Sequence, residues 1–412
     1  MKTIDDYGFT PEQKDYIKRL IEKRRDRSHQ AFFNRYGVKD LDELDDLVLD
    51  ANMLIRFFKE NNGEYFSRLV DVVMHSDKFH QITSAKEMER LFEELTLIYR
   101  SDSSRMIYAT YKIAKQLKKE MEFYILNGPL GSLFIFYLLG VLKINPMDAD
   151  VRHETLLGTY YETKKVDNIS FLVRPDCVDR CKEIAMTIFS DLKPYYSYLG
   201  YSKDNVVDVD TIYFASDDGA LDDRFEKVEG YDLDVYKNKN TFLPESLSVN
   251  VCPCNLLEDV RNVALANPFV HYEDGLSVVI NTIKTFNDYS VLGINEHNFP
   301  QLKKDPDYFD FNDIVSIISR SHSSSSDEDT VDIAPFYDRD SVFNFLKREI
   351  KLKHDICYMV MEKVRKGRYK KDEMDELFKP FYADIFEKII YLAPRSKSVQ
   401  FAYYYLVLAA DL

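Results

Sequence analysis

The predicted fold is decided by one stretch, residues 111–147, which reads YKIAKQLKKEMEFYILNGPLGSLFIFYLLGVLKINPM. Residues 105–121 are predicted to form a helix, which a short polar turn at Asn127 and Gly128 separates from a second, apolar helix. This apolar run and the C-terminal FAYYYLVLAADL are each about 13 residues or shorter, whereas a helix needs roughly 20 to cross a bilayer. Both are therefore predicted to be buried helices, and no membrane span is expected.

Further helices are predicted on the N-terminal side of this stretch. Thr10 and Pro11 supply an N-cap and a first-turn proline. The segments that begin at Asp40 and behind Ser84 carry apolar residues at three- and four-residue spacing, as amphipathic helices do. Residues 1–100 are thus predicted to be a helical N-terminal region.

Strands are predicted on the C-terminal side, where four segments are rich in β-branched and aromatic residues. These segments are VDNISFLV (166–173), TIYFA (211–215), SLSVNVC (246–252) and LSVVINTI (276–283). They favour a central sheet. A polar segment follows at Arg320–Asp332, RSHSSSSDEDTVD, which cannot bury apolar surface and is predicted to be a flexible loop. From Asp338 to the end the sequence reads as helix again.

Composition excludes some functions and some kinds of site. The chain has 70 acidic and 55 basic residues, a net charge of -15 and a pI near 5.1, so the whole molecule cannot act as a polycation on nucleic acid. Five cysteines without paired C-x-x-C spacing indicate reduced thiols rather than a structural zinc site. The N-terminus lacks the basic end and apolar run of a signal peptide, which favours a cytoplasmic location.

Ordered motifs carry a family resemblance. A glycine- and serine-rich loop opens the apolar helix, which ends before an Asn-Pro pair; these positions are Gly128, Gly131, Ser132, Asn145 and Pro146. The further motifs are HETLLG (153–158), YSVLGINEHNFPQL (289–302), YDRDSVFNFL (337–346), YMVMEKVRKGRYKK (358–371) and EKIIYLAPRSK (387–397). Together they resemble the palm and fingers of bacterial C-family replicative DNA polymerases, in particular the PolC-type DNA polymerase III alpha subunit.

The resemblance implies an α+β fold, with a polymerase beta-like palm built on a mixed sheet, helical fingers and a helical N-terminal extension. The implied domains are a helical region over 1–100, a palm-like α/β domain over 101–319, a loop over 320–332 and fingers-like helices over 333–412. The implied role belongs to DNA replication, with DNA, a nucleotide or a replisome protein as partner.

The same comparison implies that catalysis has been lost. In the family, two aspartates on one strand and a third on a neighbouring strand hold two Mg²⁺ ions for nucleotidyl transfer. The matching positions are Asn168, Ser170 and Ser290, so all three carboxylates are absent. We therefore expect a pseudoenzyme with no catalytic residues, no metal and no cofactor.

Residues that match the family's phosphate-binding positions, and a basic stretch in the fingers, remain candidates for binding. For phosphate groups they are Gly128, Gly131, Ser132, Arg395 and Lys397, although Pro129 lacks an N–H and a plain helix cap is an equal interpretation. Residues 347–371 hold ten Lys or Arg and three acidic residues, a local net charge of +7. The DNA-binding candidates within them are Lys363, Arg365, Lys366, Arg368, Lys370 and Lys371. A solvated basic surface is the alternative.

Two other functions stay open at this stage. One is an active, divergent polymerase in which relocated carboxylates bind Mg²⁺, and its candidates are Asp167, Asp208, Asp210 and Asp288. The other is a protein-interaction module that does not bind DNA. The sequence predicts no particular oligomeric state.

Overall fold

The structure is a computed structural model that describes most of the chain from residue 64 onward. The described residues are 64–82, 84–159, 162–199, 208–215, 225–227, 234–236, 246–267, 271–286, 288–294, 306–325, 336–370 and 380–411. The helices predicted near Thr10 and Asp40 lie outside them.

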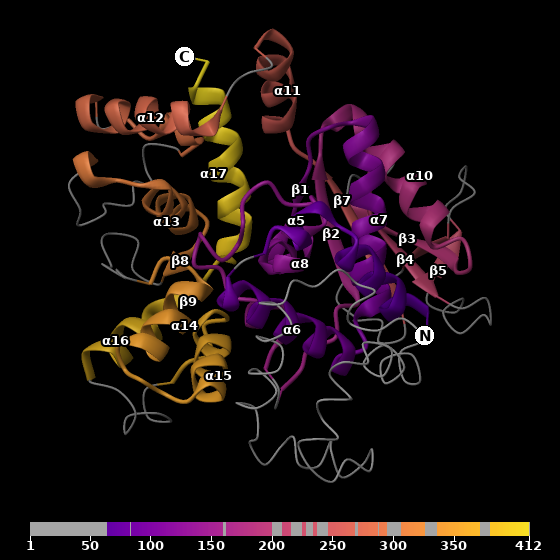
Figure 1. Ribbon diagram of the computed structural model, residues 1–412, viewed down its shortest axis with the longest axis horizontal. Helices are drawn as coiled ribbons and strands as arrows, with labels where there is room; N and C mark the ends of the chain where they lie inside the picture. Colours follow the sequence, from indigo (N-terminus) through magenta and orange to yellow (C-terminus); the bar gives the residue numbers. More distant parts are fainter. Residues whose placement is uncertain are drawn as a thin grey trace.

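A seven-stranded mixed sheet lies beside α7 (Ser104–Glu120) and α10 (Val178–Ile188), in the right half of Figure 1. Its strands are β1 (Ile125–Leu126), β2 (Asn168–Val173), β3 (Lys193–Leu199), β4 (Asp208–Ala215), β5 (Phe225–Lys227), β6 (Asp234–Tyr236) and β7 (Leu247–Pro253). The order is β1-β2-β7-β4-β3-β6-β5, with β2 and β7 parallel, β1 antiparallel to β2, and β4 antiparallel to β7. The α+β class with a mixed sheet is confirmed, as are the strands predicted at β2, β4 and β7.

One face of the sheet is apolar and covered by the helices α7 and α10. Ile169 and Phe171 of β2 and Val249 of β7 are fully buried in the core on this side. Successive strand residues point to opposite faces, so the neighbours of these residues lie on the other side. The helix predicted over 105–121 is confirmed as α7.

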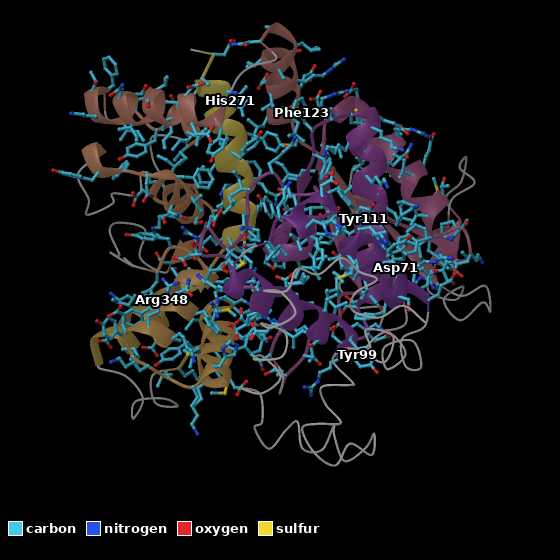
Figure 2. The ribbon with its side chains drawn as sticks, in the orientation of Figure 1. Asp71, Tyr99, Tyr111, Phe123, His271 and Arg348 are labelled. Carbon is cyan, nitrogen blue, oxygen red and sulfur yellow. The ribbon has the colours of Figure 1, made fainter. Side chains whose placement is uncertain are left out.

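The opposite face of the sheet is polar at the start of β2 and apolar near its end. Near the ends of β2 and β7, Leu172 and Cys252 pack with residues of α11 (Leu256–Ala266) and α17 (Arg395–Ala409). Phe123, labelled in Figure 2, lies in the same small core. The buried C-terminal helix predicted from the sequence is confirmed as α17.

The N-terminal helices share the main core with the sheet. Residues 64–74 are helical and precede α5 (Asp77–His80) and α6 (Ala85–Arg100), so the helix predicted behind Ser84 is confirmed. The helix predicted in the apolar stretch after Asn127 is shorter than expected. This stretch forms a 3₁₀ turn, η2 (Gly128–Ser132), and a five-residue helix, α8 (Phe134–Leu138), because Gly140 turns the chain with a φ of 67°.

The strand predicted over 276–283 is wrong, because these residues lie in helix α12 (Tyr272–Phe286). The buried positions Gly275, Val279 and Ile283 recur every four residues, which is a helical and not a strand period. The β-branched residues of this segment favour a strand, but its packing against α17 stabilises a helix. The helix α13 (Phe311–Ser321) and the 3₁₀ turn η5 (Ser290–Leu292) also pack on α17.

A helical lobe follows, with an apolar core of its own between Phe336 and Leu392. Its elements are α14 (Arg339–Arg348), α15 (His354–Val364), α16 (Pro380–Lys388) and β9 (Ile389–Tyr391), which pairs with β8 (Ser324–Ser325). The all-helical prediction after Asp338 is thus wrong at β9. No helix among the described residues is long and apolar enough to cross a membrane.

The loop prediction over 320–332 needs a correction where the structure describes it. Its first residues end α13, and β8 follows shortly after. The Ser323 hydroxyl lies 2.9 Å from the carbonyl oxygen of Ser319 and accepts the N–H of Ala393 at 3.1 Å. Hydrogen bonds from a serine side chain can therefore hold this segment in one conformation although it buries little apolar surface. Residues 326–332 lie outside the described part.

Candidate functional site

The candidate site begins on the polar face of the sheet, where Asn168 and Ser170 share one side of β2. Asn168 stands opposite Ser248 of β7 in the ladder, and Ser170 stands opposite Asn250. The Asn168 side-chain amide donates to the Ser248 hydroxyl at 2.7 Å. The first position matched to a catalytic aspartate is thus paired with a neutral hydroxyl on the neighbouring strand.

Ser170 is paired in the same way from the other side. The Asn127 side-chain amide donates to the Ser170 hydroxyl at 3.2 Å, and the Asn127 backbone N–H donates to the Ser170 carbonyl at 2.9 Å. Ser170 is buried, with 8% of its surface exposed. Neutral amides and hydroxyls that satisfy one another are poor ligands for Mg²⁺, which prefers carboxylate oxygens.

Ser290, the third matched position, does not join the other two on the sheet. It lies in η5, which packs against α12 and α17, and its backbone N–H donates to the Asp288 carboxylate at 2.8 Å. This separation follows from the helical conformation of α12, because the family's third aspartate requires a strand beside the first two.

The candidates for relocated carboxylates are dispersed. Asp167 precedes β2, and burial raises its pKa, which disfavours its charged form. Asp288 caps the turn that contains Ser290, and hydrogen bonds from the Ser290 hydroxyl and backbone N–H lower the Asp288 pKa. Asp208 and Asp210 lie on β4, and the structure describes their backbone but not their side chains. Within the described residues, no three His, Cys, Asp or Glu side chains could together hold a metal ion.

The glycine loop that matches a phosphate cradle is covered by α17. The Ser396 hydroxyl donates to the Gly128 carbonyl at 3.1 Å, and the Gln400 side chain exchanges two 2.8 Å hydrogen bonds with the backbone of Leu126. A Cβ atom at Gly131 would lie 2.6 Å from the Gln400 amide nitrogen. A residue without a side chain at Gly131 lets α17 approach the loop this closely. The next residue, Ser132, is fully buried.

The first amides of α8 already bind an internal carboxylate. Glu94, which is fully buried, accepts the N–H groups of Phe134 and Ile135 at 2.8 and 3.0 Å, and the Arg90 guanidinium donates to it at 2.6 Å. Burial raises the Glu94 pKa, while Arg90 and the two amides act in the opposite direction. A phosphate at these amides would have to displace Glu94.

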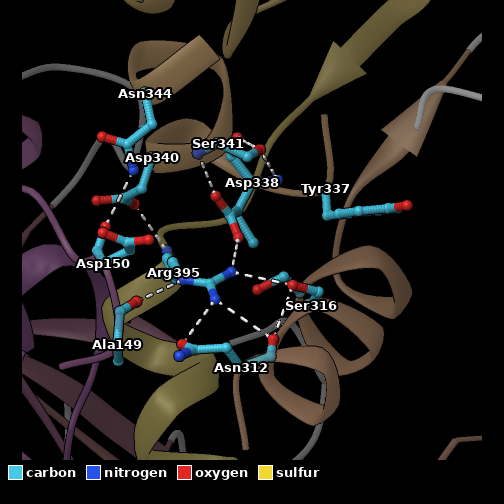
Figure 3. Close-up of polar contacts among 12 residues, drawn as sticks. Ala149, Asp150, Asn312, Ser316, Tyr337, Asp338, Asp340, Ser341, Asn344 and Arg395 are labelled. Carbon is cyan, nitrogen blue, oxygen red and sulfur yellow. Dashed lines mark hydrogen bonds and ion pairs between the residues drawn. The ribbon is translucent and has the colours of Figure 1, made fainter. Parts of the chain in front are cut away.

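Arg395 is buried and bonded within the protein (Figure 3). Its Nε donates to the Ala149 carbonyl at 2.7 Å, its Nη1 to Asp338 at 2.9 Å, and its Nη2 to the Asn312 side chain at 3.1 Å. All three guanidinium nitrogens are thus engaged by protein oxygens. Lys397, in the first turn of α17, is half-buried over the Phe401 ring, and burial lowers its pKa.

The candidate DNA-binding residues form a turn at the end of α15, which we call the basic turn (residues 363–370). Lys366, Arg368 and Lys370 are exposed, and Lys366 lies 3.8 Å from the Glu362 carboxylate. Arg365 is half-buried and donates to the same carboxylate. Gly367 has a φ of 60°, and a Cβ there would lie 2.9 Å from a β9 carbonyl, so the turn packs closely on the lobe. The lobe presents the three exposed charges to solvent. Lys371 lies outside the described residues.

Sequence reasoning missed two partners that define this site. Ser248 gave no signal, because its pairing with Asn168 depends on the strand order. Glu94 gave one: it lies on the apolar side of α6 with Leu91, Leu95 and Ile98 at three- and four-residue spacing. A carboxylate in such a stripe requires a buried partner.

No protein-family model matches this chain, and no curated protein matches its sequence. The resemblance to C-family polymerases therefore remains a hypothesis. It rests on the order of the motifs quoted above.

Proposed function

We propose that this chain is a PolC-like palm-and-fingers module without nucleotidyl-transfer activity, which binds DNA in a replication-related role. The observation that carries the proposal is the pairing of Asn168 with Ser248, and of Asn127 with Ser170, on one face of the sheet. These are the positions that the resemblance assigns to the metal-binding carboxylates, and they hold neutral groups that bond to each other.

Two further contacts support the loss of nucleotide chemistry. A triphosphate needs free amides and cations, but Glu94 accepts the amides that open α8 and Asp338 accepts from Arg395. Two-metal catalysis also needs several carboxylates close together. The described residues offer no such group.

DNA binding is supported by the charge of the basic turn. Lys366, Arg368 and Lys370 are exposed on a protein whose net charge is -15. A local reversal of sign concentrates positive potential, which attracts a phosphate backbone.

Primer extension tests the catalytic half of the proposal. The purified full chain is incubated with a primed template, deoxynucleoside triphosphates and either Mg²⁺ or Mn²⁺, beside an active polymerase as positive control. We expect no extension with either metal. Template-dependent synthesis that copurifies with the chain would refute the proposal and favour relocated carboxylates.

Gel-shift titration against salt tests the binding half. The variant carries Lys366→Glu, Arg368→Glu and Lys370→Glu, and the matched control carries Lys112→Glu, Lys119→Glu and Lys284→Glu at exposed helix positions. We expect only the first variant to lose affinity, with a salt dependence shallower by about one phosphate contact for each residue that binds. Absent or salt-insensitive binding of primed DNA by the wild-type chain would refute this half and favour a protein-interaction module.

A further inference from the structure

Three lysines from separate elements converge beside the C-terminal end of α8. Lys78 comes from α5, Lys118 from the last turn of α7, and Lys143 from the segment after α8. The Nζ of Lys78 lies 3.4 Å from the centre of the Tyr137 ring, and the Nζ of Lys118 lies 3.5 Å from the carbonyl oxygen of Gly140. We call these three residues the lysine cluster.

The charges in the lysine cluster act on one another. Burial, together with repulsion from Lys118 and Lys143, lowers the pKa of Lys78 to about 8. The pKa of Lys143 is lowered first by the surrounding protein and then by Lys118, against an opposing effect of Glu122. Among the described residues, no carboxylate lies within salt-bridge distance of any of the three.

A structural role accounts for only part of this arrangement. Lys118 lies near a carbonyl that follows α8 and at the end of α7, where a cation favours the helix dipole. Neither contact requires Lys78 or Lys143. Three cations with no carboxylate within salt-bridge distance repel each other, and Glu122 offsets only part of this repulsion, at Lys143. In a protein with 70 acidic residues such a group is unexpected. Repulsion of this kind is relieved when an anion binds.

We propose that Lys78, Lys118 and Lys143 form a binding site for a compact group of phosphate oxyanions. Ammonium groups act as point charges and suit phosphate without a fixed geometry. Lys118 and Lys143 are exposed and Lys78 is half-buried, so the cluster is open to a solute. The phosphates come from a free polyphosphate or from a nucleic-acid backbone. The cluster uses no residue of β2 or of the basic turn and does not depend on the function proposed above.

Calorimetry with inorganic tripolyphosphate tests the site on the full chain at constant ionic strength. The cluster variant carries Lys78→Gln, Lys118→Gln and Lys143→Gln, and the control carries Lys112→Gln, Lys119→Gln and Lys284→Gln. We expect the cluster variant to bind at least about tenfold more weakly than the wild type, and the control to remain close to it. Equal binding by all three proteins, or no binding by the wild type, would overturn the site.

A second measurement uses the folded wild-type chain alone. Its lysines are ¹³C-dimethylated, which retains their charge, and the titration of Lys78 is followed by NMR with and without tripolyphosphate. A bound anion must raise the Lys78 pKa, whereas a purely structural cluster leaves it unchanged. Primed DNA then identifies the source of the phosphates: if the cluster variant loses DNA affinity the backbone supplies them, and if it loses only tripolyphosphate binding a free polyphosphate does.

Discussion

Arg395 joins three segments that are distant in sequence. Its guanidinium bonds to Ala149 before α9 (Glu154–Leu157), to Asn312 in α13 and to Asp338 at the start of α14. The guanidinium spreads five donors over three nitrogens in a rigid plane and so reaches acceptors on separate segments, whereas the three donors of an ammonium group all lie on one nitrogen. The residue that resembles a nucleotide contact in the sequence is therefore a structural centre of this fold.

We expect Arg395→Met to lower the free energy of unfolding by about 3–5 kcal/mol, because it leaves the buried Asp338 carboxylate without its partner. The matched control is Arg348→Met, which removes the exposed Arg348–Asp150 ion pair and should cost less than about 1 kcal/mol. Urea denaturation at neutral pH measures both. Equal losses would show that Arg395 does not hold these segments together.

Asp340 gives the molecule a pH dependence. It is fully buried and accepts the backbone N–H groups of Arg152 and Arg395 at 2.6 and 3.1 Å. Burial, and then the neighbouring Asp338, raise the Asp340 pKa from 3.8 to about 7. The folded chain thus keeps a proton that the unfolded chain has released.

Because the folded-state pKa is the higher one, the stabilisation from this proton is complete below pH 3.8 and is lost as the pH rises through about 7. We expect the free energy of unfolding to fall between about pH 4 and pH 7, and Asp340→Asn to flatten that slope. Urea titrations at several pH values measure it, with the exposed Asp191→Asn as control. An unchanged slope in Asp340→Asn would contradict this assignment.

At the scale of elements, α12 and α17 cross in direct backbone contact. A Cβ atom at Gly275 would lie 1.7 Å from the carbonyl oxygen of Leu406. We expect Gly275→Ala to push the two helices apart and to destabilise the chain by about 1–3 kcal/mol or more, as overpacking does. Thermal unfolding followed by circular dichroism checks this, with the exposed Ser277→Ala on the same helix as control. Matching melting temperatures would mean that the crossing relaxes without cost.

The elements also show what a sequence can predict. The α6 and α7 helices followed from apolar residues at three- and four-residue spacing. The α17 helix and the strands β2, β4 and β7 followed from short runs rich in apolar, β-branched or aromatic residues. The segment over 276–283 failed because its β-branched residues favour a strand while its burial has a helical period. The bonds of Glu94 to α8 and of Arg395 to Asp338 join residues 40 or more positions apart. No local pattern could place them.

For the whole molecule, the helical lobe and the body meet through charged groups. Arg348 of α14, labelled in Figure 2, pairs with Asp150 at 2.7 Å, and Glu362 of α15 pairs with Lys164 at 2.8 Å. The lobe has a separate apolar core, with no residue of the body in it. Its attachment should therefore respond to ionic strength more than the core of the sheet does.

We expect 1 M NaCl to speed amide hydrogen exchange in α14, and to a smaller extent in α15, relative to low salt. The Debye length falls to about 3 Å, which screens the exposed Arg348–Asp150 pair more than the partly buried Glu362–Lys164 pair. The α7 helix is the internal control, since most of its contacts are apolar and lie in the main core. Asp150→Asn should raise exchange in α14 at low salt and remove most of its salt dependence. Mass spectrometry of peptic peptides resolves the three helices. If exchange rises equally in α7, salt acts on the whole fold, and the lobe is not held by its ion pairs.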